Sequence, residues 1–156
     1  MDQPSKIEAF WQSYLLTLSE ASRQKTPGYV VDQFGDTPEV ATKVGKLVRD
    51  GVKTTTSSLR WGLEYIGEPI PQVGHIELII DGNGDPLCII ELIEVAIKPF
   101  GAVDEQFAFE YGEGERTLEA WRRDNWDFHS RWCIEIGREP SETMPIVCQR
   151  FRLLYP

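Results

Sequence analysis

Apolar residues recur with a helical period near the start of the chain. The spacing i, i+3, i+4, i+7 is followed by Ile7, Phe10, Trp11, Tyr14, Leu15 and Leu18. The segment Ser5-Lys6-Ile7-Glu8 that begins this run has the sequence of a capping box, in which a hydroxyl and a carboxylate satisfy the first backbone N–H groups. The pattern predicts an amphipathic helix of about 16 residues.

A second helical pattern follows a turn-rich segment, "RQKTPGYVVDQFGDTP", that contains one short apolar patch. Thr37 can cap this helix with Pro38 at its first position, and Gly51 is a natural stop at its end. The apolar stripe between them consists of Val40, Val44, Leu47 and Val48.

The period changes beyond Gly51. The β-branched threonines after Lys53 favour a strand, "HIELII" reads as another, and the turn "DGNGDP" joins it to the long apolar strand "LCIIELIEVAIKPF". "DEQFAFEYGEGE" predicts a short helix and a glycine turn, and Thr117 can cap a helix that ends near Ile136. "MPIVCQRFRLLYP" predicts a closing strand. This order predicts an α+β fold, a small mixed β-barrel with flanking helices.

The composition is that of one soluble domain. The 156 residues are 41% hydrophobic and 26% charged, and no apolar run approaches the roughly 18 residues of a membrane span. We therefore expect a single domain over residues 1–156, with residues 1–28 as a helical extension packed on it. The N-terminus has no signal-peptide pattern, and the three cysteines form no CxxC pair, which predicts a cytoplasmic protein with reduced thiols, no membrane contact, no metal and no cofactor.

The net charge of −9 is unevenly distributed. Residues 43–62 contain five basic residues and one acidic residue, whereas residues 63–120 contain thirteen acidic and two basic residues. The overall acidity argues against non-specific duplex binding, which requires many phosphates to be neutralised. It allows a small basic cleft for one nucleotide or a short single strand.

The basic window contains the segment "GVKTTTSSLR", residues 51–60, in which a lysine precedes five hydroxyl side chains. A desolvated lysine can act as the base for a hydroxyl nucleophile, which makes Lys53 and Thr56 candidates for chemistry. Side chains alternate along a strand, so a spacing of three brings them together only at a bend or a bulge. A half-exposed, threonine-rich strand is the other interpretation.

Three further groups have structural and functional interpretations. His129 and Cys133, four residues apart, fit a surface histidine and a half-buried cysteine better than a reactive pair. Tryptophans recur on the last predicted helix, where core packing competes with base stacking: Trp121, Trp126 and Trp132. Four acids, which suit a solvated loop and helix start, include one that could orient a lysine: Glu110, Glu113, Glu115 and Glu119.

Several blocks together resemble one known family. "GVKTTTSS" resembles the GxKxxTxR/S signature of ASCH (activating signal cointegrator homology) domains, and the likeness continues through "GEPIPQVG", "DGNGDPLCIIELIEVAIKPF", "VDEQFAFEYGEGERTLEAWR" and "MPIVCQRFRLLYP". It covers roughly residues 30 to 156 and is greatest for longer, single-domain bacterial members. The resemblance implies a PUA-like barrel that binds RNA or nucleotides in a cleft beside the lysine motif.

Some small bacterial members of this family are amidohydrolases that act on N4-acetylcytidine with a lysine, a threonine and a glutamate. Carried over, these are Lys53, Thr56 and Glu110, although Tyr111 occupies the position directly before the first glycine where the family has its acid. The further candidate ligand-binding residues are Gly51, Thr54, Ser58, Arg60, Trp121 and Arg122. The leading hypothesis is an RNA- or nucleoside-binding protein. The alternatives are an amidohydrolase of acylated nucleosides and a protein-interaction module that uses the acidic residues 63–120.

Overall fold

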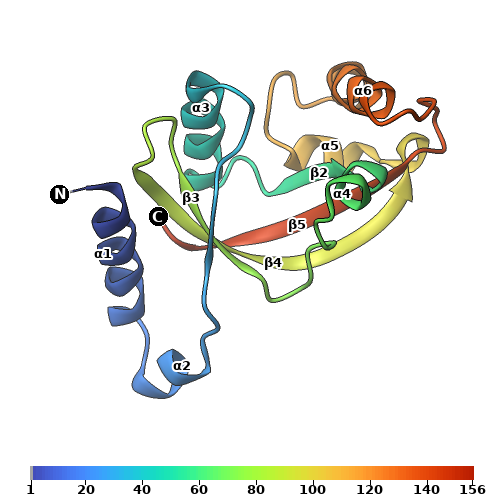
Figure 1. Cartoon of the computed structure of the whole chain (residues 1–156). Helices are drawn as coiled ribbons and strands as arrows, with labels where there is room; N and C mark the ends of the chain where they lie inside the picture. Colours follow the sequence, from blue (N-terminus) through green and yellow to red (C-terminus); the bar gives the residue numbers. More distant parts are fainter. Residues whose placement is uncertain (1) are drawn as a thin grey trace. The chain divides into compact units, whose positions relative to one another are not determined.

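The structure, a computed structural model, describes residues 2–156, apart from the side chain of Gln3. Its elements follow one another as shown in Figure 1. In chain order they are α1 (Gln3–Leu16), α2 (Glu20–Lys25), β1 (Val30–Asp32), α3 (Pro38–Arg49), β2 (Thr55–Leu59), α4 (Arg60–Ile66), β3 (Ile76–Ile80), β4 (Pro86–Pro99), the 3₁₀ turn η1 (Phe100–Ala102), α5 (Glu105–Glu110), α6 (Leu118–Glu135) and β5 (Pro145–Tyr155).

Hydrogen bonds join the strands into one sheet in the order β1-β3-β4-β5-β2. β1 runs parallel to β3, whereas β3 pairs antiparallel with β4, and β2 pairs antiparallel with β5. A register shift lies between Ile79 and Ile80 at the end of β3. The mixture of helices with a largely antiparallel sheet confirms the predicted α+β class.

The contacts divide the chain into two compact units. The first comprises the chain up to Gly51, Gly74–Glu91 and Arg152–Pro156. Its main cluster of buried side chains comes from α1, β3 and β4: Trp11, Tyr14, Ile76, Leu78 and Ile89. The second unit comprises Val52–Val73 and Leu92–Phe151.

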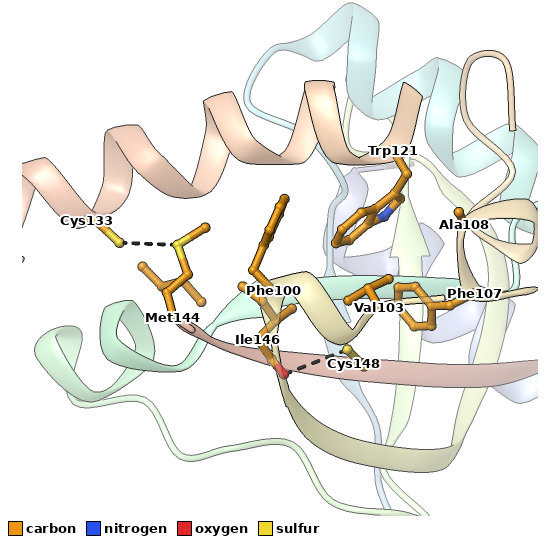
Figure 2. Packing of buried hydrophobic residues seen from close by; sticks show 10 residues of the cluster. Phe100, Val103, Phe107, Ala108, Trp121, Cys133, Met144, Ile146 and Cys148 are labelled. Carbon is orange, nitrogen blue, oxygen red and sulfur yellow. Dashed lines mark hydrogen bonds between the residues drawn. The ribbon is translucent and has the colours of Figure 1, made fainter. Parts of the chain in front are cut away.

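The core of the second unit is built around aromatic rings and small sulfur-containing side chains (Figure 2). Phe100 stacks on Trp121 with 5.3 Å between ring centroids, and Phe107 meets the same indole edge to face. Cys133 lies 3.8 Å from the sulfur of Met144. This packing fixes α5 and α6 close to β2 and β5, and these elements carry the site described below.

All four predicted helices are present, as α1, α3, α5 and α6. Thr37 accepts from the N–H of Val40 to cap α3, and Gly51 follows α3 with a left-handed φ of +76°. Thr117 caps α6 in the same way. The predicted capping box at Ser5 was wrong, because α1 begins earlier. The Asp2 carboxylate accepts from the N–H of Ser5, and proline is well tolerated in such a first turn because its missing N–H is not needed there.

Four short elements were not predicted: α2, β1, α4 and the 3₁₀ turn η1. Two of them, α2 and β1, lie in the segment whose residues indicated only turns and a short apolar patch. Helix α4 follows β2 directly, and Leu59 at its start provides no side-chain cap. It also contains Gly62, whose missing side chain leaves room for the Trp132 indole. Close packing, rather than local sequence, therefore stabilises α4.

Candidate functional site

The backbone at Lys53 is fixed from both sides. Strand β2 begins only at Thr55, so the alternation of a regular strand does not apply between Lys53 and Thr56. The N–H of Thr54 donates to the carbonyl of Glu110 at 2.8 Å, and the carbonyl of Thr54 accepts from Phe151 at 3.0 Å. These two bonds hold the residue after Lys53 between α5 and β5, and the meeting of the Lys53 and Thr56 side chains stays a prediction.

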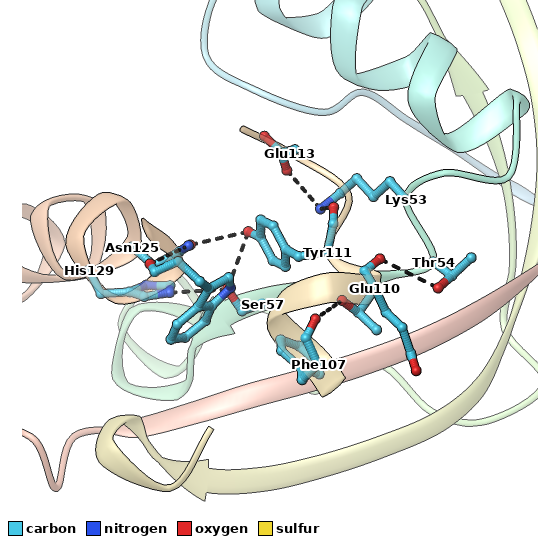
Figure 3. A network of polar contacts seen from close by, with 11 residues as sticks. Lys53, Thr54, Ser57, Phe107, Glu110, Tyr111, Glu113, Asn125 and His129 are labelled. Carbon is cyan, nitrogen blue, oxygen red and sulfur yellow. Dashed lines mark hydrogen bonds and ion pairs between the residues drawn. The ribbon is translucent and has the colours of Figure 1, made fainter. Parts of the chain in front are cut away.

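Lys53 is buried, with 1% of its surface exposed, and its ammonium group has three partners in the loop after α5 (Figure 3). The Nζ atom lies 2.7 Å from Oε2 of Glu113, 3.2 Å from the carbonyl oxygen of Tyr111 and 3.3 Å from the centroid of the Tyr111 ring. Burial lowers the pKa of Lys53 to about 8, although the charge and hydrogen bond of Glu113 act in the opposite direction. The pKa of Lys53 therefore lies close to neutral pH, where both the charged and the neutral amine are populated.

Gly112 allows this loop to pass close to the lysine backbone. Its φ is +72°, a left-handed conformation that favours glycine. A Cβ atom at this position would lie 2.6 Å from the carbonyl oxygen of Val52 and 2.7 Å from Cα of Lys53. The glycine therefore provides both the turn and the space that bring Glu113 to the lysine.

Tyr111 links the lysine to α6 and β2. Its hydroxyl donates to Oδ1 of Asn125 at 3.2 Å and lies 3.4 Å from Oγ of Ser57. Burial and the nearby charge of Glu113 raise the pKa of Tyr111 to about 12, against the effect of hydrogen bonds with Ser57 and Thr56. The phenol thus stays protonated, with the hydroxyls of Ser57 and Thr56 near its oxygen and the Lys53 ammonium over its ring.

His129 ends this chain of polar contacts. The residue is fully buried, and its Nε2 lies 3.3 Å from Oγ of Ser57. Burial lowers the pKa of His129 to about 4, so the imidazole is neutral at physiological pH. Within residues 2–156, its Nδ1 has no hydrogen-bond partner. The polar network therefore runs from the half-exposed Glu113 into an increasingly apolar interior.

The carboxylate of Glu110 has other partners than the lysine. Its Oε2 accepts from Nε of Arg150 at 2.7 Å, Gln106 donates to its other oxygen, and Arg150 also pairs with Glu94. Burial raises the pKa of Glu110, but the hydrogen bonds from Gln106 and Arg150 outweigh this effect and lower it overall. The catalytic role predicted for Glu110 stays a prediction, whereas the acid that lies on Lys53 is Glu113.

The predicted ligand-binding residues are placed in different surroundings. Thr54 bonds the carbonyl of Glu110, and Ser58 pairs with Val147 across the sheet. Arg60 forms an ion pair with Glu64 one turn along α4, and Arg122 donates to the carbonyl of Gly101. The side chains of Thr54, Arg60 and Arg122 have local partners, so nothing in these contacts directs them to the lysine.

Trp121 belongs to the core of the second unit. Only 4% of its surface is exposed, and its ring meets Phe100, Phe107 and Tyr111. Its indole N–H has no hydrogen-bond partner within residues 2–156. The exposed aromatic side chain near the site is instead Phe109, at 53% exposure, with the Arg116 guanidinium 3.9 Å from its ring centroid.

Four members of the network were not predicted to belong to it: Ser57, Tyr111, Asn125 and His129. The prediction of a surface position for His129 was wrong, because the residue is fully buried on α6. A usable signal was present in α6, where Trp121, Asn125 and His129 follow one another at steps of four and share one buried face. Tyr111 was noted only as the residue in place of the expected acid. The structure shows that it is the group around which the lysine, the serine and the asparagine gather.

The arrangement can bind and exchange protons with a polar ligand, because a buried amine and a partly exposed carboxylate lie within hydrogen-bond distance of each other. Among residues 2–156, no three histidine, cysteine, aspartate or glutamate side chains are grouped to hold a metal ion. In the same residues no helix has the length and apolar character of a membrane span. Cys88, Cys133 and Cys148 are buried free thiols.

Comparison with known proteins agrees with this architecture. The ASCH domain family model matches residues 30–155. The chain is similar to the crystal structure of an ASCH domain from Lactobacillus crispatus JV V101, with 32% identity over 97% of this chain and 96% of that one and a TM-score of 0.90. It is also similar to a crystal structure from Enterococcus faecalis V583, with 29% identity, coverage of 97% and 89%, and a TM-score of 0.80. The comparison with curated proteins gives no match. These findings confirm the PUA-like α+β fold class, and the chain belongs to the ASCH domain family.

Proposed function

We propose that the protein binds RNA or an RNA-derived nucleoside at the site formed by Lys53, Tyr111 and Glu113. Support comes mainly from one observation, the burial of a lysine ammonium against a carboxylate that keeps 35% of its own side chain exposed. Burying a lysine costs free energy, so such a residue is usually retained for a purpose other than stability. Strongly perturbed titratable groups are frequent at ligand sites.

The chemistry of a nucleoside suits the two charged groups. Glu113 can accept hydrogen bonds from ribose hydroxyls or from an exocyclic amine, and the Lys53 ammonium can donate to a carbonyl or phosphate oxygen. Phe109 is 53% exposed although the Arg116 guanidinium lies over its ring, and its exposed surface is of the kind on which unpaired bases stack. The net charge of −9 favours a small ligand or a short single strand over a long duplex.

A second candidate is hydrolysis of an acylated nucleoside such as N4-acetylcytidine. It is favoured by the pKa of about 8 of Lys53, since a base with a pKa near the working pH is efficient. In this reaction the neutral amine takes the proton of Thr56, whose oxygen attacks the acetyl carbonyl and forms an acyl-threonine. The nucleoside amine leaves with a proton from Lys53, and water then releases acetate. Glu113 would orient the lysine.

Two assays separate these candidates. Acylated and unmodified nucleosides are incubated with the protein and followed by mass spectrometry, and binding of nucleosides and short single-stranded RNA is followed by calorimetry and fluorescence anisotropy. Turnover that is lost in Lys53→Met would support the hydrolase. Binding without turnover, weakened by added salt for RNA, would support the binding protein.

Two glutamate variants form a matched pair, with Glu113→Gln as the test and Glu110→Gln as the control. Glu113→Gln removes the acid on Lys53, whereas Glu110→Gln removes an acid three residues away that is bound to Arg150. The proposal expects Lys53→Met and Glu113→Gln to weaken binding at least tenfold, on the order expected for a lost charged hydrogen bond, and Glu110→Gln to change it little. If neither binding nor turnover occurs, the site proposal is wrong and the acidic residues 63–120 become the candidate for a protein partner.

A further inference from the structure

A cavity of about 270 Å³ lies in the first unit, and none of its lining residues belongs to the Lys53 network. Its wall is formed by residues of α1, of α2 and the segment that follows it, of β3 and β4, and of the C-terminal end of β5. Apolar side chains provide part of the wall: Leu18, Pro27, Ile76 and Leu154. The volume is slightly below the range of about 300–1,000 Å³ for drug-sized ligands, so the cavity suits a small molecule.

One side chain of this wall has an unused hydrogen-bonding group. Tyr14 is 6% exposed and packs its ring against Trp11 and Tyr155, yet its hydroxyl makes no hydrogen bond with any residue from 2 to 156. Burial and the charge of Glu91 raise the pKa of this phenol, so it remains a donor. The hydroxyl is therefore available to donate to a ligand in the cavity.

The charged side chains of the cavity wall indicate the charge of such a ligand. Arg152 and Glu91 form an ion pair, with Nη2 and Nε of the arginine 2.6 and 2.7 Å from the same carboxylate oxygen. The Lys25 ammonium also lines the cavity and takes part in no ion pair within residues 2–156. The wall therefore contains two cationic side chains, Lys25 and Arg152, and one carboxylate, Glu91. Their net charge of one positive unit matches a ligand with one negative charge.

We propose that this cavity is a second binding site, for a small carboxylic acid with an apolar body. The carboxylate would accept hydrogen bonds from the Tyr14 hydroxyl and the Lys25 ammonium, and the apolar body would lie against Leu18, Ile76 and Leu154. A dianionic phosphate fits less well, because its second negative charge would lie near Glu91. The proposal does not depend on the function of the Lys53 site.

The test uses benzoate and hexanoate as probes and the neutral amide benzamide as the comparison, with binding followed on the full chain by two-dimensional ¹H–¹⁵N NMR. Both acids should shift the amide signals of Leu18, Lys25 and Thr26, and benzamide should bind at least tenfold more weakly than benzoate. Tyr14→Phe, which removes one oxygen, and Lys25→Gln should each weaken benzoate binding by about tenfold.

Lys46→Gln is the matched control, because it removes the same charge from an exposed position on α3 that does not line the cavity. It should leave the benzoate affinity unchanged. Equal binding of benzoate and benzamide, equal losses in the two lysine variants, or no shift with either acid would each overturn the proposal. A Lys53→Met variant should bind benzoate normally, which keeps this test separate from that of the Lys53 site.

Discussion

The end of helix α5 and the loop that follows it place two glutamates, three residues apart, in different roles. Glu110, in the last turn of α5, is held by Arg150, a residue of β5. Glu113, beyond Gly112, is held by the buried Lys53. Helix α5 places the carboxylate of Glu110 beside Arg150 of β5. The left-handed turn at Gly112 then changes the direction of the chain, so that Glu113 reaches Lys53. The backbone turn, more than nearness in the sequence, decides which acid joins the site.

The largest effect on stability is expected from a change at the turn itself. Gly112→Ala would place a Cβ against the backbone of Val52 and Lys53 and would strain a φ of +72°. We expect a loss of about 3–5 kcal/mol in the free energy of unfolding, combining overpacking with left-handed strain. Gly114→Ala, at a φ of +65° in open surroundings, should lose only about 1–2 kcal/mol. Urea unfolding monitored by tryptophan fluorescence compares them, and equal losses would contradict the close approach at Gly112.

A smaller effect is expected at the far end of the network. The pKa of His129 is about 4 in the folded chain and near 6.5 when unfolded. Between these values the unfolded state binds the extra proton, so the histidine destabilises the fold as the pH falls from 6.5 to 4. The cost should approach about 3 kcal/mol at the lower end.

The matched variant His129→Gln keeps a polar atom near Ser57 but does not titrate. The difference in unfolding free energy between wild type and His129→Gln should therefore change as the pH falls from 6.5 to 4, to the disadvantage of the wild type. Denaturant unfolding at several pH values measures it. A constant difference across this range would mean that His129 is not held neutral by burial.

The smallest effect is expected at Glu110. Its bond to Arg150 is partly exposed and Arg150 keeps a second partner in Glu94, so Glu110→Gln should reduce the free energy of unfolding by no more than about 1 kcal/mol. The same variant should leave ligand binding at the Lys53 site unchanged. Chemical unfolding together with the nucleoside assay checks both, and a loss of binding equal to that of Glu113→Gln would return Glu110 to the site.

The fold was predictable where local chemistry decides the structure. Thr37 and Thr117 cap their helices, Gly51 ends α3, and the long apolar segment 86–99 forms β4. The start of α1 was placed wrongly because Ser5 fits a capping box, while Asp2 satisfies the same N–H from further upstream. The short α4 could not be predicted, since it has no cap and contains a glycine that only close packing against Trp132 explains.

Lys53 could be predicted from the sequence as a residue of the site, but its partners could be predicted only in part. The motif around Lys53 and the acidic cluster after α5 were both visible in the sequence. The choice of Glu113 over Glu110 depends on a backbone conformation at Gly112 that residue spacing does not show. The roles of Tyr111, Asn125 and His129 depend on how α6 packs against β2, which is a matter of tertiary contacts.

The pKa of Lys53 tests the account most directly. It can be measured by NMR titration of a chain labelled with ¹³C at the lysine side chains, in wild type, Glu113→Gln and Glu110→Gln. We expect a value of about 8 in the wild type, a lower value in Glu113→Gln because the carboxylate that favours the charged amine is gone, and no change in Glu110→Gln. A wild-type value near 10.5 would contradict the effect of burial on Lys53, and a larger shift in Glu110→Gln than in Glu113→Gln would contradict the pairing of Lys53 with Glu113.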